Sequence, residues 1–349
     1  MNLEIIQAAI AEIGAPYADK RENIFEVTPV IEGKRLTLVG KVLEPAQVER
    51  VIAGLQERFP ELEIDARAFE VARAGAPRLL SVAANLTSMH AEPSFLSEMV
   101  TQLVNGMQVE VLWEQGRWVY ARRWHDPANP LDAMDHYMGW TYRPYLDERP
   151  EQACTHLVMS PVGLLREDPR PGAGLVTRVL GGTAVHQSEQ REDWACLTLA
   201  GGTRGWLPGA DLRALADLPS TERDRRDQLV EDAFTLVGVP YLWGGGSAHG
   251  IDCSGFAQLL HRWIGIALPR DADMQYVSGR PVEPPFKPGD LLFFGEQGEK
   301  LHITHVGVSL GGWRIIHSSR SRNGVQVDDV ENHAGLREIY LCAATYLGE

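Results

Sequence analysis

The stretch "HGIDCSGFAQLLHRW", residues 249–263, sets a cysteine between an aspartate and a serine just after a glycine-rich loop. Apolar side chains follow at helical spacing, namely Phe256, Leu259, Leu260 and Trp263. We therefore expect Cys253 in the first turn of a helix, where unpaired N–H groups and the helix dipole favour a thiolate. A cysteine that only filled a core would fit better in the middle of the apolar face. The position predicts a nucleophile.

A nucleophilic thiol needs a base, and two downstream histidines fit that need. His261 lies on the same helix about 12 Å along its axis, which is too far. "THVGVSL" and "WRIIHSS" are strand-like and are joined by Gly311-Gly312, which predicts a hairpin. Counted outward from that turn, His305 and His317 fall opposite one another to within a residue. One imidazole could take the thiol proton and the other could orient it.

A zinc site of one cysteine and two histidines is disfavoured, because no close ligand pair such as CxxC or HExxH is present. We expect no metal and no cofactor. The other cysteines, Cys154, Cys196 and Cys342, have no suggestive neighbours, and we interpret them as small buried side chains.

Bulk properties exclude two classes of partner. The 349 residues include 33 basic and 47 acidic side chains, a formal charge of −14, and no basic stripe, so nucleic acid is not an expected partner. No apolar run approaches the ~20 residues that cross a bilayer. The N-terminus lacks the basic start and uninterrupted apolar stretch of a signal peptide, which favours a cytoplasmic protein. The oligomeric state cannot be predicted.

Four segments divide the chain. Residues 1–79 have the pattern helix, strand, strand, helix, strand and form a small α+β domain of unknown role. Residues 80–147 and 148–216 share an internal repeat. Residues 217–349 have an α+β pattern, with Thr221 and Asp224 as a capping pair for the first helix.

The repeat has a spacing of 76 residues. Glu92-Pro93, Val100-Thr101, Gly106, Val109 and Trp118 recur as Asp168-Pro169, Val176-Thr177, Gly182, Val185 and Trp194. Short alternating runs between glycine turns favour a small β-barrel in each copy. The first copy carries ten extra residues around "RRWHDPANPLDAMDHY", a length typical of a functional loop.

Several of these motifs together resemble the NlpC/P60 family of papain-like cysteine peptidases. They are "PYLWGGGSAHGIDCSGF", "LPRDADMQY", "KPGDLLFF", "THVGVSL" and "IIHSS", in this order, within residues 222–349. The endings "GWTYRPYL" and "GWLPGADL" resemble the closing strand of bacterial SH3 (SH3b) domains. The arrangement is similar to γ-D-glutamyl-L-diamino-acid endopeptidases of cell-wall recycling, although residues 1–79 lie outside the resemblance.

The resemblance implies roles for particular residues. Cys253 would be the nucleophile, His305 the base and His317 the third polar residue. Tyr241 would border the active site, and the backbone N–H of Cys253 would help to bind the oxyanion.

The resemblance also implies a pocket for the free amine of L-Ala-γ-D-Glu. Asp252 and Ser254 flank the nucleophile and would contribute to it, as would Tyr137 and Glu92 from the first SH3b unit, with Glu98 as the alternative to Glu92. Ala272 and Asp273 replace a hydroxyl residue that many relatives carry, which puts one substrate contact in doubt.

The implied activity is cleavage of the bond between γ-D-Glu and meso-diaminopimelate or L-Lys in free murein peptides, through a thioester on Cys253. A secreted hydrolase of polymeric peptidoglycan, anchored by SH3b units, is the first alternative. A non-catalytic wall-binding protein is the second, although such a protein would be expected to lose the cysteine or a histidine.

Overall fold

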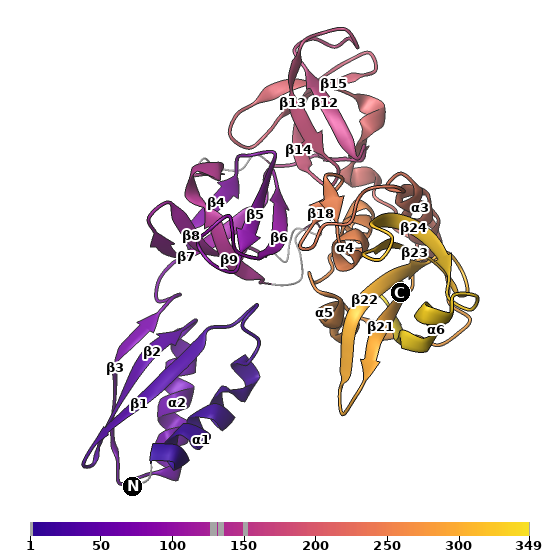
Figure 1. Cartoon of the computed structure of the whole chain (residues 1–349). Coiled ribbons are helices and arrows are strands. Elements are labelled where there is room, and N and C mark those ends of the chain that lie inside the picture. The colour runs from indigo at the N-terminus through magenta and orange to yellow at the C-terminus, as the bar shows by residue number, and fades with distance from the viewer. Residues whose placement is uncertain (1–2, 126–130, 132–135, 149–152, 349) are drawn as a thin grey trace.

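The computed structural model describes residues 3–125, 131, 136–148 and 153–348. Its elements fall into four units that follow one another along the chain (Figure 1). We name them the N-terminal unit (residues 3–71), the first β unit (79–147), the second β unit (156–214) and the C-terminal unit (222–348). No helix in the described ranges is both long enough and apolar enough to cross a membrane.

The N-terminal unit packs two helices on a three-stranded sheet. Its elements are α1 (Leu3–Gly14), η1 (Ala15–Tyr17), β1 (Phe25–Glu32), β2 (Arg35–Val42), α2 (Pro45–Arg58) and β3 (Glu63–Val71). β1 and β2 form an antiparallel hairpin, whereas β3 returns parallel to β2 because α2 crosses over between them. Ile6, Leu36, Leu38 and Leu55 are fully buried between the layers. The predicted order of elements is confirmed.

The two β units each contain seven strands. The first has β4 (Leu79–Val82), β5 (Leu86–His90), β6 (Met99–Val104), β7 (Gln108–Gln115), β8 (Trp118–Arg123), β9 (Met138–Tyr142) and β10 (Leu146–Asp147). The second has β11 (His156–Val158), β12 (Val162–Arg166), β13 (Leu175–Leu180), β14 (Ala184–Arg191), β15 (Trp194–Thr198), β16 (Arg204–Pro208) and β17 (Leu212–Ala214).

The strand orders of the two sheets match. One reads β10-β4-β7-β8-β9-β5-β6, and the other reads β17-β11-β14-β15-β16-β12-β13, which is the same path. Trp118 and Trp194 occupy equivalent strands, and so do Trp140 and Trp206. The repeat in the sequence is therefore a repeat in the structure. The prediction of a barrel is not met, because in the described residues β10 does not pair with β6, nor β17 with β13.

The C-terminal unit has a six-stranded sheet in the order β20-β25-β21-β22-β23-β24. Its elements are α3 (Glu222–Phe234), β18 (Gly246–Ser247), β19 (Gly250–Ile251), α4 (Cys253–Trp263), α5 (Ala272–Ser278), β20 (Arg280–Pro281), β21 (Leu291–Gln297), β22 (Leu301–Ser309), β23 (Arg314–Ser319), β24 (Gly324–Asp329), α6 (Ala334–Ile339) and β25 (Tyr340–Thr345). The Thr221 hydroxyl accepts a hydrogen bond from the Asp224 N–H and caps α3 as predicted.

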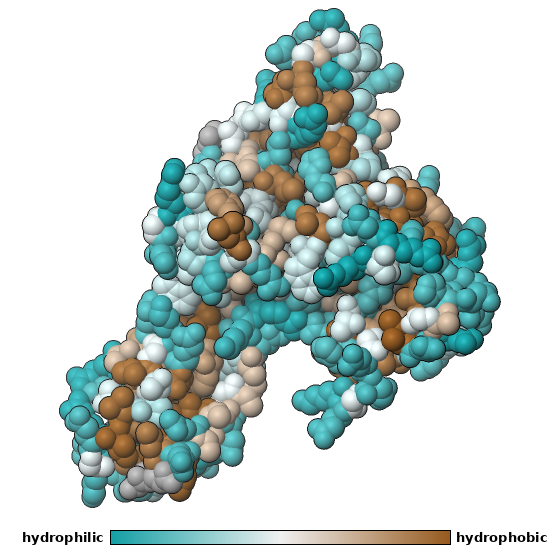
Figure 2. Space-filling model, in the orientation of Figure 1, coloured by the Kyte–Doolittle hydropathy of each residue, from teal (hydrophilic) through white to brown (hydrophobic). Residues whose placement is uncertain are grey.

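Helix α4 is the centre of the C-terminal core. It packs against β22 and β23, and its side chains Phe256, Leu260 and Trp263 are fully buried. The β21–β22 hairpin projects away from this core, and an open recess separates its tip from the N-terminal unit (Figures 1 and 2). The buried face of α4 fixes where its first residue, Cys253, lies relative to the sheet.

Removing the central aromatic ring of α4 should destabilise the C-terminal unit. Phe256→Ala deletes a fully buried side chain, and we expect a loss of about 3–5 kcal/mol in the free energy of unfolding. Scanning calorimetry would measure the lowered transition. Val277→Ala, at an α5 position that is 81% exposed, is the matched control and should change the stability by less than about 0.5 kcal/mol. Equal transitions for the two variants would contradict this account of the core.

Candidate active site

Helix α4 begins at Cys253 because Asp252 caps it. The Asp252 Oδ1 atom accepts the Gly255 N–H at 2.7 Å, which satisfies one of the unpaired donors of the first turn. Gly255 is required by close packing, since a Cβ there would lie 2.2 Å from the Gly245 carbonyl oxygen. The cap and this contact together seat the start of the helix against the glycine-rich loop.

Cys253 opens onto a cleft of about 770 Å³ that three of the four units line. The N-terminal unit contributes Arg21, and the first β unit contributes Glu98, Val100 and Tyr137. The remaining walls belong to the C-terminal unit, including Tyr241, Asp252, Ser254, His305 and His317. No described residue of the second β unit lines it.

The two predicted histidines are in contact. His305 Nε2 and His317 Nδ1 are 2.6 Å apart, and His317 Nε2 lies 3.0 Å from Asp328 Oδ2. The Asp328 carboxylate can therefore accept a hydrogen bond from His317 Nε2–H. The His317 ring, held in this way, orients His305. Because His305 Nε2 contacts His317, His305 Nδ1 is the nitrogen that could accept the thiol proton.

The predicted register of the hairpin was wrong by two residues. Val308 pairs with Ile316, so the position across from His317 is Gly307 and not His305. A Cβ on Gly307 would lie 3.4 Å from the His317 Cβ, and without it the two rings meet on the diagonal with centroids 4.9 Å apart. The small residue between the histidines makes their contact possible.

The thiol is buried against the strand that carries His305. Cys253 is 8% exposed and is hydrogen-bonded to backbone groups of Val306 and Ser254. Burial raises the pKa of Cys253 to about 12, and the negative charge of Asp252 adds to this effect. Burial also lowers the pKa of His305 to about 3. Burial thus favours a neutral thiol and a neutral imidazole, contrary to the prediction that the helix start would favour the thiolate.

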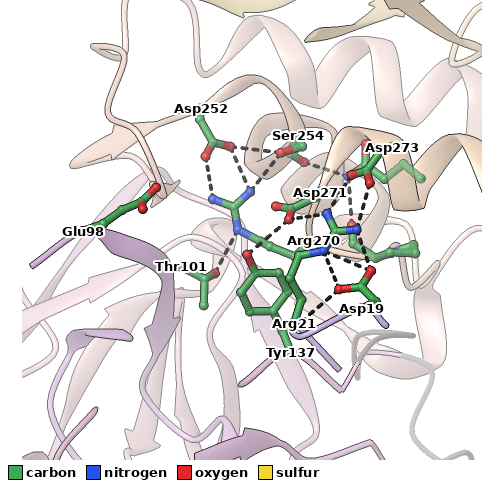
Figure 3. A network of polar contacts seen from close by, with 12 residues as sticks. Asp19, Arg21, Glu98, Thr101, Tyr137, Asp252, Ser254, Arg270, Asp271 and Asp273 are labelled. Carbon is green, nitrogen blue, oxygen red and sulfur yellow. Dashed lines mark hydrogen bonds and ion pairs between the residues drawn. The ribbon is translucent and has the colours of Figure 1, made fainter. Parts of the chain in front are cut away.

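Both carboxylate oxygens of Asp252 accept hydrogen bonds from other residues of the chain. Arg270 forms a bidentate ion pair with it, at 3.0 Å to Oδ1 and 2.6 Å to Oδ2, and the Gly244 N–H donates to Oδ2 (Figure 3). Arg270 Nη1 also donates to the Ser254 hydroxyl, and Arg270 is only 1% exposed. Because these bonds saturate the carboxylate, the structure weighs against Asp252 as the group that binds a substrate amine.

Only one of the two glutamates considered for the pocket lines the cleft. Glu98 lines the cleft and accepts a hydrogen bond from Trp243 Nε1 at 2.8 Å, whereas Glu92 is exposed and does not line it. Of the two alternatives, the structure therefore places Glu98 and not Glu92 at the cleft. Tyr137 lines the cleft as predicted, and its hydroxyl donates to Asp271 Oδ2 at 3.1 Å. Most of the inserted loop that precedes Tyr137 (126–130 and 132–135) lies outside the described residues.

The end of the cleft near Tyr137 is rich in acidic groups. Asp271 and Asp273 lie there, and Arg21 of the N-terminal unit pairs with both aspartates. Asp273 thus has a partner within the chain in place of the hydroxyl that the resemblance led us to look for. Among the described residues, no group of three or more His, Cys, Asp or Glu side chains is placed to hold a metal ion.

Sequence reasoning missed Arg21, Arg270 and Asp328. A weak signal existed for Asp328, because "GVQVDD" alternates polar and apolar residues and so presents Asp328 on one face of its strand. Nothing local to Arg21 or Arg270 indicates that each reaches into another unit. Tyr241 was found by resemblance, and it lines the same cleft as Cys253, where burial raises the pKa of its hydroxyl.

Comparisons with known proteins agree with this arrangement. The NlpC/P60 family model matches residues 238–343. A γ-D-glutamyl-L-lysine dipeptidyl-peptidase of Bacillus cereus is 28% identical over 261 residues, which cover 72% of this chain and 76% of that protein. Dipeptidyl-peptidase 6 of Lysinibacillus sphaericus is 26% identical over 282 residues, 76% of this chain and 97% of that one.

The fold is also shared with a solved structure. The crystal structure of an NlpC/P60 family protein from Bacillus cereus superposes with a TM-score of 0.67 at 24% identity, covering 77% of this chain and 100% of that one. Cys253, His305 and His317 all lie within the residues that the family model matches, and all three line the cleft. The chain thus has an NlpC/P60 domain toward its C-terminal end, at residues 238–343, and is homologous over most of its length to γ-D-glutamyl-L-lysine dipeptidyl-peptidases.

Proposed function

We propose that this chain is a cysteine endopeptidase that hydrolyses the bond between γ-D-Glu and a diamino acid, meso-diaminopimelate or L-Lys, in free murein peptides with an N-terminal L-Ala. The observation that carries the proposal is a chain of contacts that begins at the cleft. Cys253 lies against the strand that carries His305, His305 contacts His317, and His317 contacts Asp328. The activities for which the relatives from Bacillus cereus and Lysinibacillus sphaericus are named support the substrate class.

The proposed reaction starts from a neutral Cys253 thiol and a neutral His305 imidazole. As the Cys253 sulfur attacks the γ-carbonyl of D-Glu, His305 takes the thiol proton, so no thiolate needs to form before the substrate binds. The imidazolium is stabilised through His317 and Asp328 and gives its proton to the departing amine of the diamino acid. A water molecule, deprotonated by His305, then opens the thioester and restores the thiol. The Cys253 N–H and the Tyr241 hydroxyl are the expected oxyanion donors.

A carboxylate that lines the cleft suits the free ammonium group of L-Ala. A desolvated ammonium requires a carboxylate, and peptides still joined to sugar lack this group. Glu98 is the carboxylate we assign to it, because among the described residues it pairs with the neutral Trp243 N–H and with no cation, whereas Arg270 already neutralises Asp252. Asp252 and Ser254 then act on the substrate through the position of Arg270 and of the helix start.

We infer that the two β units are SH3b-like modules. Their common strand order and the paired Gly-Trp strands support this, although the sheets are open. The first unit forms one wall of the cleft through Glu98, Val100 and Tyr137. A cleft walled in this way favours short free peptides over intact wall, and hence peptide recycling in the cytoplasm over the secreted-hydrolase and wall-binding alternatives.

Cys253→Ala should abolish cleavage of L-Ala-γ-D-Glu-L-Lys, with a loss in kcat of at least about 1000-fold because the attacking atom is gone. Mass spectrometry of released L-Ala-D-Glu would measure it. Cys342→Ala is the control thiol and should retain the wild-type rate, since Cys342 does not line the cleft. A Cys253→Ala protein that turns over at the wild-type rate would refute the mechanism. Intact sacculi incubated in parallel should release little product; rapid release would favour the secreted-hydrolase alternative.

Asp328→Asn should lower kcat about tenfold or more while KM stays near the wild-type value, because the amide no longer stabilises charge on the histidine pair. Steady-state kinetics with the same tripeptide would test it. Asp329→Asn, whose wild-type carboxylate accepts hydrogen bonds from Glu331 and Asn332, is the neighbouring control. If both variants behave alike, Asp328 has no role in the relay.

Glu98→Gln should raise KM about tenfold with little change in kcat, because it removes the charge but keeps an acceptor for Trp243. Glu92→Gln should leave KM unchanged. The effect should vanish for a peptide whose amino group is acetylated, since that peptide has no ammonium to lose. An equal change with both peptides would assign the amine elsewhere.

A further inference from the structure

The N-terminal unit reaches the active-site cleft through one loop. After η1, residues 18–23 turn toward the C-terminal unit, and Arg21 lines the cleft. Its Nη1 donates to Asp271 Oδ2 at 2.9 Å and to Asp273 Oδ1 at 2.8 Å, and its Nη2 donates to Asp273 Oδ2 at 2.8 Å (Figure 3). The Asp19 carboxylate holds the same guanidinium from within the loop. Arg21 is thus a fixed cation that joins units 250 residues apart in the sequence.

The same loop holds the backbone on both sides of Tyr137. The Met138 N–H donates to the Arg21 carbonyl at 2.8 Å, and the His136 N–H donates to Glu22 Oε1 at 3.2 Å. Between these two bonds, the Tyr137 hydroxyl donates to Asp271 Oδ2, the oxygen that also accepts from Arg21. Backbone and side chain of Tyr137 are therefore both set by the position of this loop.

Charge explains why Arg21 matters here. Asp271 and Asp273 lie close to one another in the cleft. Burial raises the pKa of Asp271, and Arg270 and Arg21 oppose that shift. Arg270 is committed to Asp252, Ser254 and Thr101, so Arg21 is the cation that bridges the two remaining aspartates. Without it, like charges would repel and the loop bearing Asp271 would be free to move.

We propose that the N-terminal unit is a specificity element of this peptidase. Arg21 acts as a positioning residue: by clamping Asp271 and Asp273 it fixes Tyr137 and closes the acidic end of the cleft, so that the free amino end of the peptide fits and a longer or acylated end is refused. This inference rests on the proposed function and assigns part of it to a unit for which the sequence indicates no chemistry.

The test uses full-length protein and two peptides, L-Ala-γ-D-Glu-L-Lys and its N-acetylated form. Arg21→Ala should raise KM for the free peptide about tenfold, with kcat within about twofold, since a displaced pocket weakens positioning without touching the thiol. The preference for the free over the acetylated peptide should fall by a similar factor. Arg21→Lys keeps the charge without the two-pronged geometry and should give an intermediate KM.

Arg35→Ala is the matched control, because it removes another arginine of the same unit that pairs with an aspartate, Asp65, away from the cleft. It should leave both constants and the preference unchanged. A wild-type KM and preference in Arg21→Ala would overturn the inference while leaving the proposed function intact, as would a lowered kcat at constant KM. Wild-type protein that cleaves neither peptide would refute the proposed function and this inference with it.

A double-mutant cycle separates positioning from direct contact. If Arg21 acts through Tyr137, then Arg21→Ala combined with Tyr137→Phe should raise KM no more than the larger of the two single changes. Independent contributions would multiply, and that result would overturn the assignment of Arg21 as a positioning residue for Tyr137.

Discussion

The buried ion pair between Asp252 and Arg270 is the constraint on which the site depends. One carboxylate caps α4, receives the Gly244 N–H from the glycine loop and neutralises an arginine that is 1% exposed. Arg270 in turn donates to Thr101 of the first β unit, so the pair ties the nucleophile's helix to the neighbouring wall of the cleft. Losing either partner would leave a buried charge uncompensated, which commonly costs about 3–5 kcal/mol. The start of the helix and the shape of the cleft are therefore set by the same interaction.

Burial also decides the protonation of the catalytic groups. The thiol and the imidazole are both held neutral by desolvation, and the carboxylate that could stabilise positive charge, Asp328, lies at the far end of a two-histidine relay. In the proposed reaction, charge therefore separates only when a carbonyl is present to accept the electron pair of the sulfur.

How much the sequence could predict follows from how local each feature is. The helix start at Cys253, the hairpin that carries the histidines and the duplicated β unit are written in short patterns, and all three are present. The pairing of Asp252 with Arg270 and the reach of Arg21 are contacts between distant segments, for which periodicity carries no information. The direction of the Cys253 pKa depended on burial, which the helix dipole alone could not reveal. Barrel closure failed because alternation predicts strands but not which edges meet.

The two copies of the β unit occupy different positions around α4. The first copy faces the cleft, whereas the second lies behind α4, where Arg262 donates to the Gly182 carbonyl and Arg213 donates to the Trp263 carbonyl. A Cβ on Gly181 would lie 2.7 Å from the Trp263 ring, so the two surfaces are closely fitted. The second copy thus supports the helix that begins at Cys253, whereas the first contributes side chains to the cleft. Two copies of one fold have therefore taken different positions around a single helix, one packed behind it and one in front of its first residue.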